Sequence, residues 1–156
     1  MASPFAEMRR KLALMEKGEL TPAAALGLRP SHACQLEQYA ASCAASADFS
    51  TAAAAALLAT TADPDSANAW LLLGNALGAQ RKASAAIVAL ERVVAIDPAH
   101  LQGWVDLGEA SLALLDYAAA ARALTQAIAL DPHARTPQGL RAQMLVVETI
   151  QSIEGT

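Results

Sequence analysis

The sequence predicts an all-α protein, and three observations carry this prediction. Alanine, the strongest helix former, dominates the chain, whereas aromatic residues make up only 4% of its 156 residues. Runs of alternating β-branched residues, which would indicate strands, are missing from it. Finally, Trp, Leu-Gly and Asp-Pro recur at a fixed spacing, so the helices are expected to form repeated units. A chain of this length is expected to be one domain with its own core.

The repeat appears when the chain is aligned with itself at a shift of 34 residues, the separation of Asp63 from Asp97. A third Asp-Pro, Asp131-Pro132, follows after one more shift of 34 residues, and a degenerate copy of the repeat precedes the two full copies. The three copies are assigned to 33–66, 67–100 and 101–134. The matched pairs include Trp70 with Trp104, Leu73 with Leu107, Gly74 with Gly108, Ala86 with Ala120, and Leu90 with Leu124.

Each copy is expected to form two antiparallel helices, which in the second copy cover about 67–80 and 84–96. Trp70, Leu73 and Leu77 share one face of the first helix. Gly74 and Ala86 are small where the two helices must approach closely. Pro98 cannot continue the second helix, so the chain turns there.

These residues resemble the tetratricopeptide repeat, whose motif reads W-x-x-L-G, a small residue two positions on, an alanine in the second helix, and then D-P. The resemblance implies helix pairs stacked into a solenoid with a concave side. It also implies that a ligand lies in the groove lined by the first helix of each pair.

The two ends differ from the repeats. The N-terminal segment, 1–32, carries an apolar stripe that ends at Gly18, followed by a short helix starting at Thr21-Pro22. This stripe is expected either to pack on its own domain or to contact a second copy or a partner. It consists of Phe5, Met8, Leu12 and Met15.

The C-terminal segment, 135–156, is expected to form a capping helix from Thr136-Pro137 to about Ile153. Its apolar side is predicted to cover the last repeat, with a polar side facing outward. The apolar side consists of Leu140, Met144, Val147 and Ile150, and the polar side of Gln138, Arg141 and Glu148.

The groove-facing row is expected to lie beside the Trp-Leu-Gly row, at spacings of three and four along each first helix. The alternative is that this row only faces water. In the first repeat the row is Cys34, Glu37, Ala41 and Ala44; in the second, Asn68, Leu71, Asn75 and Gly78; in the third, Gln102, Val105, Glu109 and Leu112.

This row holds no Lys or Arg. Tetratricopeptide co-chaperones that grip acidic chaperone tails use Lys, Arg and Asn there as a carboxylate clamp, because a carboxylate needs cationic donors. Asn75 matches such a clamp, but its basic partners are absent, so that ligand class is excluded. The row predicts a protein ligand with a largely apolar segment, either extended or an amphipathic helix.

Candidates for catalysis or cofactor binding fail on their spacing, so we expect no enzyme, no cofactor and no metal site. The histidines lie about one or two repeats apart and cannot converge on a metal, and the Asp-Pro aspartates are turn residues. No glycine-rich phosphate loop, Cys-x-x-Cys or Ser-His-Asp candidate is present. The residues concerned are His32, His100, His133, Asp63, Asp97 and Asp131.

Charge and hydropathy narrow the remaining classes of function and cellular location. The net charge of −4 argues against a nucleic-acid surface. The longest apolar-looking run, 51–62, is mostly alanine and too short to span a bilayer, so no membrane insertion is expected. Cys34 and Cys43, nine residues apart on one predicted helix, are too distant for a disulfide. We therefore expect a cytoplasmic protein.

The whole layout resembles the class II chaperones of bacterial type III secretion, which hold hydrophobic translocator proteins before export. The segments MEKGELTPAAALGL and LEQYAASCAASADFSTAAAAAL carry this resemblance. That family has aromatic pocket residues in its first repeat where this chain has Glu37, Ala41 and Ala44. An alanine-lined groove better suits a needle-subunit chaperone that cradles an amphipathic helix. The alternatives are an adaptor in envelope or pilus assembly, and a helper domain of a longer enzyme.

Overall fold

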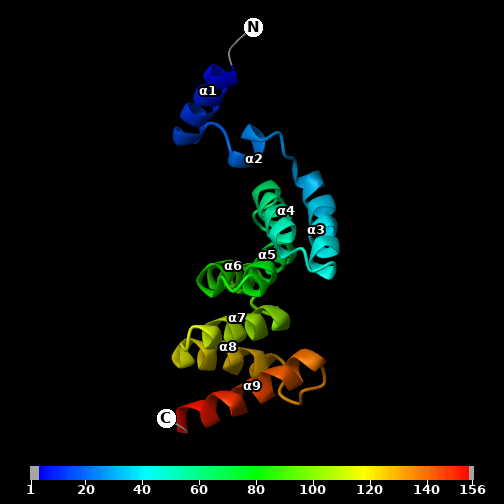
Figure 1. The fold of residues 1–156 in the computed structure, drawn as a ribbon, viewed down its shortest axis with the longest axis vertical. Helices are drawn as coiled ribbons and strands as arrows, with labels where there is room; N and C mark the ends of the chain where they lie inside the picture. The colour runs from blue at the N-terminus through cyan, green and yellow to red at the C-terminus, as the bar shows by residue number, and fades with distance from the viewer. Residues whose placement is uncertain (1–3, 155–156) are drawn as a thin grey trace.

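The computed structural model describes residues 4–154, with side chains from residue 6 onward. Helices follow one another along the long axis, from α1 at one end to α9 at the other (Figure 1). No strand occurs among the described residues, which confirms the predicted all-α class. The helices are α1 (Pro4–Glu16), α2 (Pro22–Ala25), α3 (Pro30–Ala45), α4 (Phe49–Ala62), α5 (Ala67–Ala79), α6 (Ala83–Ile96), α7 (Leu101–Ala113), α8 (Tyr117–Leu130) and α9 (Pro137–Glu154).

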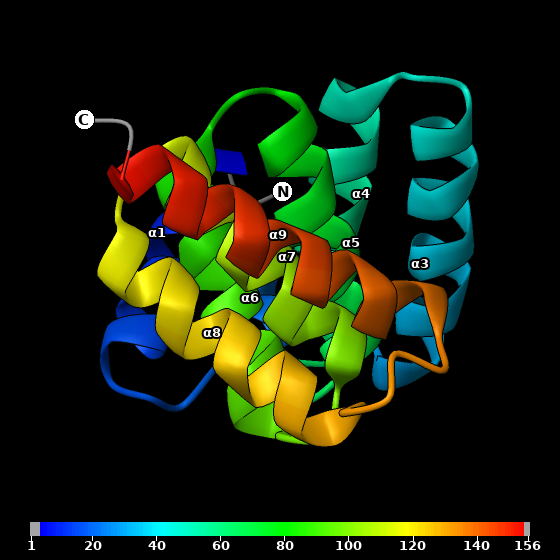
Figure 2. The same cartoon turned by 90° about the horizontal axis from the view of Figure 1, so that it is seen from below.

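Three helix pairs form the body of the molecule: α3 with α4, α5 with α6, and α7 with α8. Each pair contacts the next through its second helix, and the first helices α3, α5 and α7 also contact one another in order. Viewed along the stack, α9 crosses α7 and α8 and closes the last pair (Figure 2). The chain is therefore a tetratricopeptide array, as the repeat predicted.

Glycines in the repeated Leu-Gly pair let the two helices of a pair approach closely. A Cβ on Gly74 would lie 2.7 Å from Leu90 Cγ, and one on Gly108 would lie 2.7 Å from Leu124 Cγ. Real Cβ atoms do not come so near, so only glycine fits here while Leu90 and Leu124 fill the space between the helices. Leu124 is fully buried and Leu90 nearly so.

The spacing of Trp from Asp-Pro has a hydrogen-bonding cause. Trp70 Nε1 donates to the carbonyl of Pro64 at 2.8 Å, and Trp104 Nε1 donates to the carbonyl of Pro98 at 2.9 Å. Each indole therefore ties the first helix of a repeat to the turn that precedes it, and satisfies its own donor.

The turns inside the helix pairs repeat as well. Ala47, Arg81 and Leu115 all adopt positive φ, between 59° and 61°, and they too are separated by the repeat length. L-residues pay about 1 kcal/mol or more in this left-handed region. The reversal between two antiparallel helices thus imposes the same backbone strain in each pair.

The prediction for the face of the C-terminal helix is wrong. The sequence placed Leu140, Met144, Val147 and Ile150 against the last repeat, but all four are about half exposed. The buried side of α9 consists of Gly139, Ala142, Leu145 and Thr149. Small side chains form most of this buried face because α9 packs closely on both α7 and α8.

The N-terminal helix is set apart from the repeats. Among the described helices α1 contacts only α2, and α2 in turn contacts α4. Lys11 Nζ donates to the carbonyl of Ala25 at 3.0 Å, which fixes α1 on α2. Met8 and Leu12 of the predicted stripe are exposed, and Met15 is half-buried. The Phe5 side chain lies outside the described residues. The stripe is thus not packed on the helix pairs.

Candidate functional site

The predicted groove row divides into a part that reaches the surface and a part that is built into the core. Asn75, Gly78 and Ala41 are exposed, and Glu109 is half-buried. Val105 is only 1% exposed. Leu71 packs in the core between α5 and α6, and Leu112 in the core beneath α9. All three side chains support the stacking of helices; Val105 is closed to a ligand, whereas Leu71 and Leu112 are partly buried and keep some exposed surface.

The first repeat meets the second through a polar contact. The Glu37 carboxylate on α3 accepts hydrogen bonds from Ser66 Oγ at 2.6 Å and Asn68 Nδ2 at 2.7 Å. Two predicted row residues, Glu37 and Asn68, are therefore brought together, but they satisfy each other. Cys34, on the same helix, is exposed with a free thiol, and Cys43 is also a free thiol.

The second and third repeats enclose a pocket of about 540 Å³, called here the α5–α7 pocket. Asn75, Gly78 and Glu109 of the predicted row line it. A Cβ at Gly78 would meet nothing within 4 Å, so this glycine borders open space. The other lining residues are Gly74, Ala79, Arg81, Ala83, Ala86, Leu90, Asp106, Ala110, Ala113 and Leu114.

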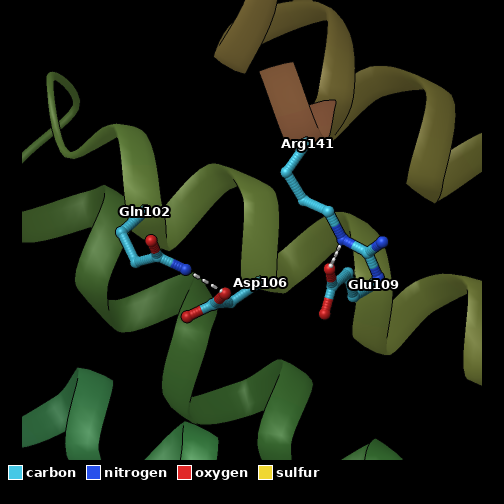
Figure 3. A network of polar contacts seen from close by, with 4 residues as sticks. All are labelled: Gln102, Asp106, Glu109 and Arg141. Carbon is cyan, nitrogen blue, oxygen red and sulfur yellow. Dashed lines mark hydrogen bonds and ion pairs between the residues drawn. The ribbon is translucent and has the colours of Figure 1, made fainter. Parts of the chain in front are cut away.

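Asp106 is the groove residue that the sequence did not single out. It also borders a second, smaller pocket, of about 230 Å³, between α7 and α9. Its Oδ1 accepts a hydrogen bond from Gln102 on the same helix, whereas its Oδ2 is buried without a partner (Figure 3). Burial raises the pKa of this carboxyl to about 6, against the opposing effect of Gln102 and Asn75. Asp106 directly follows Val105 of the predicted groove row, and this neighbouring position is the only signal in the sequence that could have suggested a role for it.

Two arginines reach the walls of the pockets from outside the predicted row. Arg81 lies in the α5–α6 turn and lines the α5–α7 pocket. Arg141 comes from α9, and its Nε donates to Glu109 Oε1 at 2.7 Å (Figure 3). Glu109 raises the pKa of Arg141. Since Glu109 already occupies Arg141, and Asp106 lies beside them, the site offers no cluster of cations for a ligand carboxylate.

Histidines and turn aspartates act as local caps. His100 Nδ1 accepts from the backbone N–H of Gly103 at 3.0 Å at the start of α7, and His32 Nδ1 accepts from that of Arg29. Asp131 accepts from both Thr136 and the backbone of Arg135, which lowers its pKa. In the part of the chain that the structure describes, no three His, Cys, Asp or Glu side chains are grouped to hold a metal.

None of the described helices combines the length and the apolar character needed to span a bilayer.

Comparisons with known proteins agree with this geometry. The family model described as "Tetratricopeptide repeat" matches residues 67–100, the second repeat of the sequence analysis. No curated protein matches the chain.

Solved structures share the fold at low identity. The first tetratricopeptide domain of Spaghetti (RPAP3), bound to an HSP90 peptide, is 16% identical with a TM-score of 0.75, covering 81% of this chain and 97% of that one. The Yersinia enterocolitica type III secretion translocator chaperone SycD is 19% identical with a TM-score of 0.71, covering 77% of this chain and 84% of that one. The TPR2B domain of yeast Sti1, in complex with pHsp70, is 18% identical with a TM-score of 0.74, covering 78% of this chain and 98% of that one. These similarities show that the chain shares the fold of these tetratricopeptide structures.

Proposed function

We propose that this protein binds a segment of another protein in the α5–α7 pocket and the groove beside it. The observation that carries the proposal is the pocket itself, whose walls are formed by small apolar side chains of α5, α6 and α7. Such walls admit a backbone or a helix closely, and the few polar groups, chiefly Asn75 and Asp106, fix its orientation.

The pocket discriminates against acidic peptide tails. A ligand carboxylate entering beside Asp106 and Glu109 would face two carboxyl groups of the protein, and Arg141 is already paired with Glu109. Desolvating a carboxylate is costly unless cationic donors offset its charge, and Arg81 is a single cation on the pocket wall against these two carboxyl groups. The HSP90 peptide and the pHsp70 named for two of the similar structures are therefore not proposed as ligands here.

Within this function, we propose that the protein is a cytoplasmic chaperone that holds a hydrophobic secreted substrate of a type III secretion system. Two features support it: the similarity to SycD over 77% of this chain, and apolar side chains left exposed on the two terminal helices. SycD itself is described in complex with a peptide of the translocator YopD. The alternative is a general tetratricopeptide adaptor in envelope or pilus assembly, which the fold supports equally.

Co-expression distinguishes the chaperone function from the adaptor function. A chaperone should make an otherwise insoluble hydrophobic protein, encoded beside its own gene, soluble in a stoichiometric complex. Recovery of that protein only in the insoluble fraction would contradict the chaperone function, and complexes with soluble assembly proteins alone would favour the adaptor.

The pocket is tested by filling it. Gly78→Leu places a side chain in open space, so the fold should persist while the pocket closes and binding falls at least tenfold. Ala85→Leu, at an exposed site of α6 away from the pocket, is the matched control. Equal binding by both variants would place the site elsewhere.

A further inference from the structure

The C-terminal helix α9 takes the place of a first helix in the array. It contacts α7 and α8, in the same way as α7 contacts α5 and α6, and α5 contacts α3 and α4. The first helices α3, α5 and α7 are each paired with a second helix as well, whereas α9 contacts no further helix of the described chain. The last unit of the stack, at the end marked by α9 in Figure 1, is therefore half of a helix pair.

The sequence of α9 can be placed in register with that of α5. A shift of 70 residues, the separation of Ala69 from Gly139, also aligns Ala67 with Pro137, the first residues of the two helices. Ala69 and Gly139 are both buried, so the two helices present corresponding sides to the preceding pair. In this register Leu140, Met144 and Val147 fall on Trp70, Gly74 and Leu77.

Those three positions of α5 form the face that packs on α6. A Cβ at Gly74 would lie 2.7 Å from Leu90 Cγ. The guanidinium carbon of Arg92 lies 5.7 Å from the centre of the Trp70 ring. Trp70 and Leu77 also pack against the buried cluster that contains Leu90. A first helix thus holds its second helix through these positions.

The corresponding face of α9 is uncovered. Leu140, Met144 and Val147 are 52%, 48% and 53% exposed. At 3.6 residues per turn they form one stripe opposite the buried side of α9, which contains Gly139 and Ala142. The stripe therefore points along the stack, to the place that the next second helix would occupy. It is called here the α9 end face.

We infer that the α9 end face binds an amphipathic helix of a partner protein, which packs antiparallel to α9 and completes a fourth helix pair. The contact continues the packing of the stack, because α9 presents the positions through which α5 holds α6. A second helix from another copy of this chain does not fill the place, since α4, α6 and α8 bury their apolar faces within the stack of their own molecule.

Met144 determines which helix fits. In α5 and α7 a glycine at this position leaves room for a leucine of the second helix, Leu90 or Leu124. Met144 fills that room, so the partner helix must bring a small side chain, Ala or Gly, to the opposite point. Apolar side chains one turn to either side cover Leu140 and Val147. The partner is thus an amphipathic helix with a small residue at the centre of its apolar face.

This surface is separate from the α5–α7 pocket. None of Leu140, Met144 and Val147 lines that pocket. The inference therefore goes beyond the proposed function and does not depend on it.

Two synthetic helices serve as probes. Both have the sequence of α6, Ala83–Ile96, and are held helical by a chemical staple on the side that faces solvent in the protein. One keeps Leu90 and the other carries Leu90→Ala. When they are titrated into the 15N-labelled protein, both should shift the amide signals of α9. The Ala probe should bind at least about fivefold more tightly than the Leu probe, because it has room for Met144.

Variants of the protein locate the contact. Leu140→Glu with Val147→Glu should abolish the shifts. Val88→Glu, at an exposed apolar residue of α6, is the matched control and should leave them unchanged. Gly78→Leu, which fills the α5–α7 pocket, should also leave them unchanged. Circular dichroism melts should show each variant folded.

A size swap tests the register. Met144→Gly gives α9 the glycine that faces Leu90 within the α5–α6 pair. This variant should reverse the preference and bind the Leu probe about fivefold more tightly than the Ala probe.

Three results would overturn the inference. The first is the absence of shifts in α9 with either probe, and the second is a preference between the probes that Met144→Gly does not change. The third is a mass in light scattering of twice the 16.1 kDa of one chain that Leu140→Glu with Val147→Glu reduces to one chain. That result would show that a second copy, and not a partner helix, covers the α9 end face.

Discussion

Replacing Asp106 by Asn should stabilise the protein at neutral pH, because the folded chain must bury a carboxylate there. Burial raises the pKa of Asp106 from its ordinary 3.8 to about 6, and its Oδ2 has no hydrogen-bond donor. Asn keeps the shape of the side chain, and its Oδ1 can still accept from Gln102. It carries no charge to desolvate.

The sign and size of the effect follow from proton linkage. Between about pH 4 and pH 6 the folded state holds a proton on Asp106 that the unfolded state has lost, so the contribution of this group to stability falls as pH rises. The two pKa values differ by about 2, and at about 1.4 kcal/mol for each pH unit the loss reaches about 3 kcal/mol above pH 7. Asp106→Asn removes this loss, so its stabilising effect should be small at pH 4 and about 3 kcal/mol at pH 7.5.

Urea denaturation followed by circular dichroism, at half-unit steps from pH 4 to pH 8, measures this difference. Asp65→Asn removes the same charge at an exposed position in the α4–α5 turn and serves as the control. A difference between Asp106→Asn and wild type that does not change with pH, or that favours the wild type at pH 7.5, would refute the assignment of Asp106 as a buried carboxyl with a raised pKa.

Three further predictions concern the frame of the array. Gly108→Ala should lower the free energy of unfolding by about 1–3 kcal/mol, because the added Cβ meets Leu124. Gly78→Ala should raise it by up to about 1 kcal/mol, because alanine is the better helix former and has room there. Equal effects of the two substitutions in urea denaturation would contradict the close packing at Gly108. Leu115→Gly should stabilise by up to about 1 kcal/mol by relieving positive φ, and a lower melting temperature would count against this strain. Asp131→Ala should lower the melting temperature, because it removes the acceptors for Thr136 and Arg135. The decrease should be larger at pH 7 than at pH 3, because the pKa of Asp131 is lowered in the folded state and its stabilisation is lost as pH falls. A decrease that does not change with pH would exclude that role.

The fold could be predicted from sequence because it depends on residues that repeat. Trp70 and Trp104, Gly74 and Gly108, and the Asp-Pro turns stand at fixed separations, and each has a local role that any copy reproduces. The predicted helices at 67–80 and 84–96 were found at Ala67–Ala79 and Ala83–Ile96. Local periodicity fixes such elements before any tertiary contact is known.

The site was harder to predict because a groove depends on how the pairs stack. Spacing of three and four placed Val105 in the groove row, but the arrival of α9 buries it. The same spacing missed Asp106, one position further on, which lines both pockets. Arg141 comes from a helix outside the repeats, so no periodicity within them could place it against Glu109.

The prediction of the packing face of α9 was wrong for a related reason. Hydrophobicity alone selected Leu140, Met144, Val147 and Ile150 as the packing face, yet close approach to α7 and α8 selected the small residues Gly139 and Ala142. Side-chain volume decided this face.

The α5–α7 pocket is proposed to hold a segment of a partner protein. The most direct measurement is the yield of soluble complex when the wild type, Gly78→Leu and Ala85→Leu are each co-expressed with a hydrophobic secreted protein encoded beside this gene. We expect a stoichiometric complex for the wild type and Ala85→Leu and its loss for Gly78→Leu, with all three proteins folded. Equal yields from Gly78→Leu and the wild type would contradict it.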